Sequence, residues 1–376
     1  MVSQGAGAGH PRRRGRRLDE AVRGLGVTPK LVIGANGFLG SHVTRRLVDA
    51  GEEVRVMVRP NANTTSIDDL DVTRFHGDVF DTDTVRAAMT GCDDVYYCVV
   101  DTRAWLRDPA PLFRTNVDGL RNVLDVAVEP EIAAGLRRFV FTSSYTTVGR
   151  GRGRIATEAD QISRRGLTPY VRSRVQAEDL VLRYAAERGL PAVAMCVSTT
   201  YGDGDWGRTP HGAFIAGTVF GKLPFVMAGI QLEAVGVDDA AAAMLLAAER
   251  GRTGERYLIS ERMTTNAEVV RIAADEAGVP PPPKTISVPM LYALGALGTL
   301  KARFTDKDAE LSLKSVRMMR AEFAVDHTKA VTELGWQPRP VEQSIREAAR
   351  FWVRLRDAGR KAKAAQAAQA AQEETT

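Results

Sequence analysis

The chain has 376 residues, 44% of them hydrophobic, which is enough to bury a full core in one large domain or two. Its net charge of +5 is concentrated at the start, because residues 1–28 hold six arginines and two acidic residues, a balance of +4 that leaves +1 for the rest. This distribution argues against a nucleic-acid-binding face on the folded body. We expect residues 1–28 to be a disordered basic tail.

The remaining composition indicates a soluble, cytoplasmic protein. No apolar run approaches the length that spans a bilayer, so we expect no membrane span. Three cysteines lie in apolar runs, and their spacing indicates neither a disulfide nor a metal site (Cys92, Cys98, Cys196). We therefore expect no metal, and a small molecule rather than a nucleic acid as the partner.

The most informative stretch begins at Lys30, where four residues with the pattern of a buried strand lead into a turn with three glycines and then an amphipathic helix. Glycines let the backbone approach phosphates closely, and the free N–H groups of a helix N-terminus face the negative charge. The spacing G-x-x-G-x-x-G predicts a dinucleotide site, with these cofactor-binding residues: Gly34, Asn36, Gly37, Phe38, Leu39 and Gly40.

The second strand, Glu53–Arg59, bears on the choice of cofactor. A carboxylate at the end of this strand would accept a hydrogen bond from the ribose 2′-hydroxyl of NAD, whereas an arginine there accommodates the 2′-phosphate of NADP. The strand ends Val58-Arg59-Pro60, so NADP is favoured over NAD, with a solvated Arg59 as the alternative. After a third strand, Val72–His76, we place Asp78 and Val79 beside the adenine; Asp78 has the alternative role of capping a helix over Thr82–Met89.

Strands four to six, predicted over Asp94–Val100, Arg138–Ser143 and Val193–Ser198, carry polar and apolar residues to the same sheet edge. Ligands bind at the carboxyl ends of strands in such sheets. A long helix is predicted over Pro111–Val128, and Trp105 and Phe113 either line a pocket or fill core. We assign Val99, Val197 and Ser198 to the cofactor and Trp105, Tyr145 and Thr199 to the substrate.

A catalytic pair is predicted at the start of the next helix. Thr168 and Pro169 are an N-cap and first-turn signal, and the helix runs to Arg188 before Gly189. Tyr170 and Arg174 share one face of it. A neighbouring cation and a helix N-terminus both stabilise a phenolate, so Tyr170 is a candidate acid/base, with Ser144 orienting the substrate oxygen. The alternative is a surface pair on an amphipathic helix.

The chain is predicted to divide into a dinucleotide-binding domain and a smaller region. Residues 29–202 form the first, completed by 235–260, where Asp238 and Asp239 are expected to cap a helix and Arg256–Ser260 to return to the main sheet. Residues 203–234 and 261–354 form a substrate-binding region, in which an apolar helix over Ser287–Leu300 either covers the pocket or rests on a membrane. Residues 355–376 are a low-complexity tail.

Several motifs in order from Lys30 to Arg354 resemble the extended short-chain dehydrogenases/reductases, the NAD-dependent epimerase/dehydratase superfamily. They include the glycine turn, Phe113-Arg-Thr-Asn116, Phe141-Thr-Ser-Ser144, Tyr170-Val-Arg-Ser-Arg174 and Val237-Asp-Asp. The chain is most similar to dihydroflavonol 4-reductase-like proteins and hopanoid-associated sugar epimerases. The resemblance implies a doubly wound, Rossmann-type parallel sheet with an interleaved C-terminal substrate region, a Ser-Tyr-Lys catalytic set and homodimers formed through the long helices.

The chain departs from that family pattern at three positions. Arg174 replaces the lysine, which in the family also binds the nicotinamide ribose; Val197-Ser198-Thr199 stands where many relatives have a proline; and Leu232-Glu-Ala-Val-Gly lacks an arginine that would hold a diphosphate. We expect an NADP(H)-dependent oxidoreductase that interconverts a carbonyl and a secondary alcohol on an apolar small molecule. The alternatives are an NAD-dependent sugar epimerase/dehydratase and, because of Arg174, a non-catalytic NADP-binding sensor.

Overall fold

The computed structural model describes residues 28–373 except 152, 306, 307, 321 and 322. The predicted basic tail of residues 1–28 therefore lies outside the described residues apart from Thr28. No helix within the described ranges is both long enough and apolar enough to cross a bilayer.

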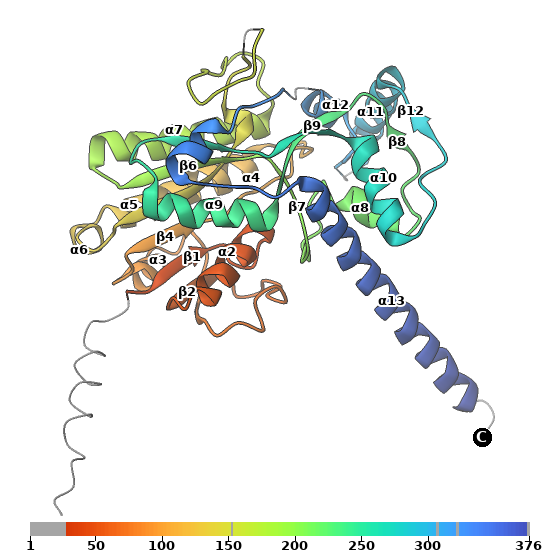
Figure 1. The fold of residues 1–376 in the computed structure, drawn as a ribbon, viewed down its shortest axis with the longest axis horizontal. Helices are drawn as coiled ribbons and strands as arrows, with labels where there is room; N and C mark the ends of the chain where they lie inside the picture. Colours follow the sequence, from red (N-terminus) through yellow and green to blue (C-terminus); the bar gives the residue numbers. More distant parts are fainter. Residues whose placement is uncertain (1–27, 152, 306–307, 321–322, 374–376) are drawn as a thin grey trace, which may run out of the picture.

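A seven-stranded sheet of parallel strands organises the molecule (Figure 1). Its order is β3-β2-β1-β4-β5-β6-β10, so the chain winds outward from β1 in both directions. The strands are β1 (Lys30–Ile33), β2 (Val54–Val58), β3 (Thr73–His76), β4 (Asp94–Tyr97), β5 (Arg138–Ser144), β6 (Ala192–Val197) and β10 (Arg256–Ile259). The predicted doubly wound α/β fold is confirmed, including the late return of β10 to the sheet beside β6.

Helices cover both faces, which explains why the central strands are apolar on both sides. One face packs Leu31, Tyr97 and Phe139 against α3 (Thr82–Met89), α5 (Leu120–Ala127) and α7 (Pro169–Arg188). The other packs Val32, Tyr96 and neighbouring residues against α2 (Phe38–Asp49), α9 (Val237–Arg250) and the π-helical turn η3 (Ala330–Leu334). The short helix α6 (Pro130–Ala133) precedes β5.

A smaller region lies beside the carboxyl edge of the sheet. Its strands form a sheet β11-β9-β7 and a pair β12-β8: β7 (Thr199–Tyr201), β8 (Val226–Met227), β9 (Gln231–Gly236), β11 (Arg262–Thr265) and β12 (Thr285–Ile286). Its helices are α8 (Gly212–Val219), α10 (Asn266–Ala277), α11 (Val288–Arg303), α12 (Leu313–Met319) and α13 (Val341–Glu373). Helix α13 runs unbroken through residues 354 and 355, and its end projects from the body (Figure 1).

Local signals explain most of the element ends. Helix α7 has the predicted bounds, since the Thr168 hydroxyl accepts a hydrogen bond from the Val171 amide at 3.4 Å and Gly189 has φ 68°. The helix predicted over Pro111–Val128 is instead three segments: α4 (Ala110–Phe113), a π-helical turn η1 (Arg114–Gly119) and α5. The cap of α3 is Asp81, which accepts from the Thr84 amide at 3.1 Å, so the alternative role of Asp78 as that cap is wrong.

Candidate active site at the carboxyl edge of the sheet

The glycine turn after β1 is packed so tightly that side chains are excluded from it. Gly34 has φ +84°, and a Cβ on Gly40 would lie 2.2 Å from the Gly34 carbonyl oxygen. A Cβ on Gly37 would lie 3.2 Å from the same atom. Helix α2 begins directly at this turn with no side chain capping it and no acidic residue in its first turn. Its N-terminal amides are therefore suited to a phosphate.

The other predicted cofactor residues surround this turn. Val99 lies against it, because a Cβ on Gly34 would meet the Val99 side chain at 2.9 Å. Arg59 is exposed immediately after β2, beside the end of β3, and Asp78 and the buried Val79 follow β3. The Asp78 carboxylate accepts a hydrogen bond from the Phe80 amide at 3.2 Å. Asn36, in the turn, reaches the Asn63 carbonyl at 3.2 Å; Phe38 and Leu39 open α2.

Ser144, Tyr170 and Arg174 come together at the ends of β5 and α7. Ser144 is the last residue of β5, paired in register with Val197 of β6. Tyr170 lies in the first turn of α7, is 9% exposed, and is close enough to Ser144 for that side chain to act on its pKa, while the Ser144 hydroxyl contacts Thr146 Oγ1 at 2.8 Å. Arg174, one turn later, is 1% exposed, donates to the Thr142 carbonyl through Nη2, and places its guanidinium carbon 5.2 Å from the centre of the Phe141 ring. The surface-pair alternative is therefore wrong.

Burial opposes the predicted acidification of the phenol. Desolvation raises the pKa of Tyr170 above its usual value of 10, although the charge of Arg174 and the nearby Ser144 side chain both act to lower it. Burial likewise lowers the pKa of Arg174 from its usual 12.5. The charge of Arg174 acts in the expected direction, but burial keeps the phenol protonated at neutral pH.

Buried donors without partners fit a dinucleotide at this edge. The Nε and Nη1 atoms of Arg174 and the Ser198 hydroxyl are buried and lack a hydrogen-bond partner among the described residues. An unsatisfied buried donor costs about 1–3 kcal/mol. Ribose hydroxyls and a carboxamide would supply acceptors to such donors. With the glycine turn as a phosphate cradle, the residues fit NAD or NADP.

An asparagine that the sequence analysis did not assign holds the loop in front of Tyr170. Asn116, buried in η1, accepts from the Asp101 amide at 2.8 Å and donates to the Asp101 carbonyl and the Ser173 hydroxyl, each at 3.1 Å. Asn116 thereby fastens the segment after β4 to α7 next to Tyr170. Asn116 appeared only in a motif of the resemblance, and nothing local in the sequence indicates these bonds.

A buried carboxylate, Glu178, supports the site from behind. It accepts from Ser143 Oγ at 2.5 Å and Thr147 Oγ1 at 2.7 Å, and it pairs with Arg256 at 2.9 Å. Cys196 Sγ donates to the same carboxylate at 3.2 Å. Glu178 therefore joins β5, β6, α7 and β10 directly beneath Ser144. Sequence spacing gives no signal for it, because its partners are 18 to 78 positions away.

The predicted substrate residues lie in different surroundings. Trp105 lines a cavity of about 230 Å³ between the segment after β4 and helices α11 and α12. Tyr145 is buried and stacks near Phe323, with ring centres 5.9 Å apart. Thr199 begins β7 and is buried. In the described ranges, no group of three or more histidine, cysteine or carboxylate side chains is arranged to hold a metal.

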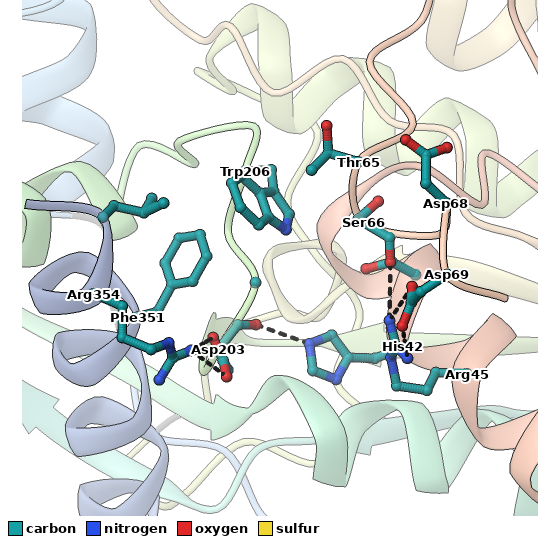
Figure 2. Close-up of a pocket in the computed structure, with 13 residues that line it drawn as sticks. His42, Arg45, Thr65, Ser66, Asp68, Asp69, Asp203, Trp206, Phe351 and Arg354 are labelled. Carbon is teal, nitrogen blue, oxygen red and sulfur yellow. Dashed lines mark hydrogen bonds and ion pairs between the residues drawn. The ribbon is translucent and has the colours of Figure 1, made fainter. Parts of the chain in front are cut away.

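A separate cavity of about 510 Å³ lies on the far side of the glycine turn (Figure 2). It is lined by α2, the segment after β2, the loop after β7 and α13, and contains none of the three catalytic candidates. Trp206 and Phe351 pack edge to face on one wall of it, with ring centres 5.0 Å apart (Figure 2). Two of its carboxylates pair with arginines of the lining, Asp69 with Arg45 at 2.8 Å and Asp203 with Arg354 at 2.6 Å, and Asp68 pairs with Arg74 outside the lining at 3.0 Å.

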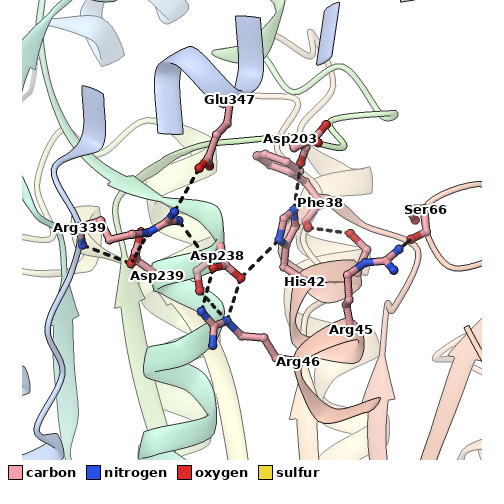
Figure 3. A network of polar contacts seen from close by, with 11 residues as sticks. Phe38, His42, Arg45, Arg46, Ser66, Asp203, Asp238, Asp239, Arg339 and Glu347 are labelled. Carbon is pink, nitrogen blue, oxygen red and sulfur yellow. Dashed lines mark hydrogen bonds and ion pairs between the residues drawn. The ribbon is translucent and has the colours of Figure 1, made fainter. Parts of the chain in front are cut away.

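A polar network ties the start of α2 to the smaller region (Figure 3). Asp238 accepts from Arg46 Nε and Nη2, each at 2.8 Å, and lies 3.9 Å from His42. The nearby His42 ring and the Arg46 guanidinium hold the pKa of Asp238 well below its usual range. Asp239 pairs with Arg339 at 3.2 Å. The N-cap of α9 is Gly236, without a side-chain bond, so the expected capping by Asp238 and Asp239 is wrong.

Comparison with known proteins identifies the family. Residues 30–260 match the model of the NAD dependent epimerase/dehydratase family. The chain belongs to this family. A relative from Synechocystis sp., described as "Putative dihydroflavonol 4-reductase", is 30% identical over 85% of this chain and 93% of its own. "Sterol demethylase protein B" from Methylococcus capsulatus is 28% identical, covering 87% and 98%.

A solved structure agrees with the family assignment. The crystal structure of gox2253 is 30% identical and has a TM-score of 0.75, covering 87% of this chain and 98% of that one. The resemblance inferred from the motifs is confirmed. The family and the names of its relatives make this chain an NAD(P)-dependent enzyme.

Proposed function

We propose that the protein is an NADP(H)-dependent oxidoreductase that interconverts a carbonyl and a secondary alcohol on an apolar small molecule. The observation that carries this proposal is the meeting of Ser144, Tyr170 and a buried Arg174 at the carboxyl edge of the sheet. A bound nicotinamide would supply hydride chemistry at this edge. Ser144 orients the substrate oxygen, and the protonated Tyr170 hydroxyl donates a proton to it during reduction.

Arg174 has two roles in this proposal. Its charge stabilises the phenolate that remains after proton donation, which offsets part of the desolvation that raises the pKa of Tyr170. Its free Nε and Nη1 donors are available to the hydroxyls of the cofactor ribose. The rigid guanidinium is held by the Thr142 carbonyl and the Phe141 ring, so it replaces the lysine of the family with a fixed rather than a mobile cation.

The choice of NADP rests on Arg59. Its exposed side chain follows β2, where the ribose 2′ position lies in a dinucleotide fold, and no carboxylate ends that strand. We expect Arg59→Ala to weaken NADP binding by about 10-fold or more while NAD binding stays within about two-fold, because a charge-assisted bond contributes about 1.5–3 kcal/mol. Dissociation constants measured by fluorescence titration test this, with Arg121→Ala, an exposed arginine on α5, as the control.

The residues of strand β9 support an apolar substrate. At the position where the family's sugar-nucleotide enzymes carry an arginine, the segment Leu232–Val235 holds Glu233, a buried carboxyl that accepts from Ser260 Oγ at 2.5 Å. Burial raises the pKa of Glu233. A diphosphate would find no cation from this strand. The relative named for sterol demethylation is consistent with an apolar substrate.

Replacing the phenol tests the proposed chemistry. Tyr170→Phe is expected to lower the NADPH-dependent reduction of ketones by more than about 100-fold without loss of NADPH binding, since it removes only the proton donor. Tyr184→Phe is the matched control, because it removes a hydroxyl bonded to Asp125 at 2.6 Å on the same helix. Unchanged turnover in Tyr170→Phe would contradict the proposed acid. NADPH binding without turnover of any ketone or alcohol would favour the non-catalytic sensor.

The cellular form is also a proposal. We propose a cytoplasmic homodimer that forms through α5 and α7, the helices by which the resemblance implies dimers. Light scattering coupled to size-exclusion chromatography measures the mass directly. A mass of 40.8 kDa at micromolar concentration would contradict the dimer.

A further inference from the structure

Helix α11 carries a continuous apolar stripe on its outer face. Four large side chains along it are exposed: Met290 by 52%, Leu297 by 62%, Leu300 by 51% and Phe304 by 82%. At about 100° per residue these positions lie within about 80° of one another around the helix. Leu291, Gly295 and Ala302 are buried on the opposite face. The stripe is therefore not the packed side of the helix, and burying it against the body would require turning the helix over.

Cations outnumber carboxylates around the stripe, although the exposed Asp308 and Glu310 follow α11. Residues 284–305 contain Lys284, Lys301 and Arg303 and no acidic residue. On the helical wheel Lys301 lies at one edge of the stripe and Arg303 beyond the other edge. None of these three cations forms an ion pair with another described residue. The exposed Arg317 of the neighbouring α12 and Arg320 at its C-terminal end contribute further positive charge.

The inner face of α11 lies beside the approach to Tyr170. Thr299, Ala302 and Arg303 line the 230 Å³ cavity together with Trp105. Lys314 of α12 holds the same segment by donating to the Leu106 carbonyl at 3.2 Å. Leu106 in turn packs in one apolar cluster with Tyr170, Leu112 and Met318. The segment after β4 therefore joins the cavity that α11 lines to the cluster around Tyr170.

We propose that α11 lies in the interface of an anionic lipid bilayer, with its stripe in the acyl region and its flanking cations at the headgroups, and that the substrate enters from the bilayer. This rests on the proposed function for the apolar substrate. Apolar burial combined with attraction to anionic lipid is the binding mode of interfacial helices. A second copy of the chain would bring the same excess of cations against itself, whereas anionic headgroups complement that excess.

Vesicle co-sedimentation of the full-length protein tests the proposal. Wild type is expected to sediment with vesicles of equal parts phosphatidylglycerol and phosphatidylcholine and much less with phosphatidylcholine alone. Leu297→Ser with Leu300→Ser should weaken binding by about 10-fold or more. Lys301→Gln with Arg303→Gln should reduce the preference for phosphatidylglycerol. Ile155→Ser, another exposed apolar position, is the control and should bind as wild type does.

Two outcomes would overturn the proposal. Equal binding by wild type and the double leucine variant would assign vesicle binding elsewhere, the arginine-rich start included. If wild type does not bind vesicles and the double leucine variant has a different oligomeric state from wild type, α11 is instead a contact between two copies of the chain. Reduction of a water-soluble ketone in vesicle-free buffer should be unchanged in the variant. Because vesicle binding is read without turnover, failure of the proposed chemistry is distinguishable from failure of the membrane proposal.

Discussion

At the scale of single residues, the replacement of the family lysine by Arg174 is the feature that most affects chemistry. A buried ammonium could turn toward either the phenol or a ribose, whereas this guanidinium is fixed by the Thr142 carbonyl and the Phe141 ring. Two of its donors remain free for a ligand. The geometry thus preserves the charge beside Tyr170 while restricting where hydrogen bonds to a cofactor can form.

Substitution of Arg174 should therefore lower activity in a graded way. Arg174→Lys is expected to reduce kcat/KM by about 10-fold, since charge is kept but the planar hydrogen-bonding geometry is lost. Arg174→Met should cost about 100-fold or more, because Tyr170 loses the neighbouring cation that lowers its pKa. Steady-state kinetics measures both, with the exposed Arg172→Lys as control. A large gain in Arg174→Lys would instead favour the non-catalytic sensor.

The pH dependence of reduction follows from the protonated phenol. Since burial raises the pKa of Tyr170 above 10, the donor form dominates through the neutral range, and reduction should decline only as pH rises past 10. Ultraviolet titration of tyrosinate absorbance, compared between wild type and Tyr170→Phe, locates the ionisation. A titration of this residue near pH 7 would show that a missing ligand or charge dominates its environment.

At the scale of secondary-structure elements, the site depends on the packing of α7 against β5, β6 and β10 through Glu178. Arg256 is largely buried where it meets this carboxylate, with its side chain 13% exposed. Removing one partner of such a pair leaves an uncompensated charge. The hydroxyls of Ser143 and Thr147 would also lose their acceptor. Ser144 lies between these two residues, so the network positions it.

The stability of the fold should reflect this network. Glu178→Ala is expected to lower the free energy of unfolding by about 3 kcal/mol, the lower end for a broken buried pair. Glu187→Ala, exposed on the same helix, should change it by less than about 0.5 kcal/mol. Urea denaturation followed by circular dichroism measures both. A small effect of Glu178→Ala would mean that solvent reaches Arg256.

Sequence reasoning succeeded where the signal is local. The glycine turn and the ends of α7 follow from backbone conformation and capping, which neighbouring residues determine. It failed where a distant partner decides the geometry. The π-helical turn η1 contains Asn116, whose bonds go to Asp101 and Ser173, and the carboxylates at the start of α9 bond to α2 and Arg339. Helical periodicity carries no information on either.

At the scale of the whole molecule, the main sheet is completed by a strand that lies far along the chain. β10 pairs with β6 only after the chain has built β7, β8 and β9 of the smaller region. The two regions are further joined by the pairing of Arg339 with Asp239. Part of the smaller region therefore lies between β6 and β10 in sequence and the rest follows β10, so the dinucleotide fold cannot be separated from it by a single cut.

Truncation should expose this dependence. A chain ending at residue 202 leaves β6, buried along its whole length in the full protein, as an open sheet edge, so we expect aggregation and no NADP binding. A chain ending at residue 358, within the exposed end of α13, should remain folded and retain NADP binding. Size-exclusion chromatography and thermal melts distinguish them. A monodisperse, NADP-binding 1–202 fragment would contradict the structural role assigned to β10.

The position of β10 also has a consequence for synthesis on the ribosome. Translation at roughly 5–20 residues per second separates the appearance of Val197 from that of Arg256 by about 3–12 s. During that interval the nascent chain has six adjacent strands, and the edge of β6 that later pairs with β10 is unpaired. An unpaired edge favours aggregation. We therefore expect overproduction without matching chaperone capacity to yield inclusion bodies rather than folded protein.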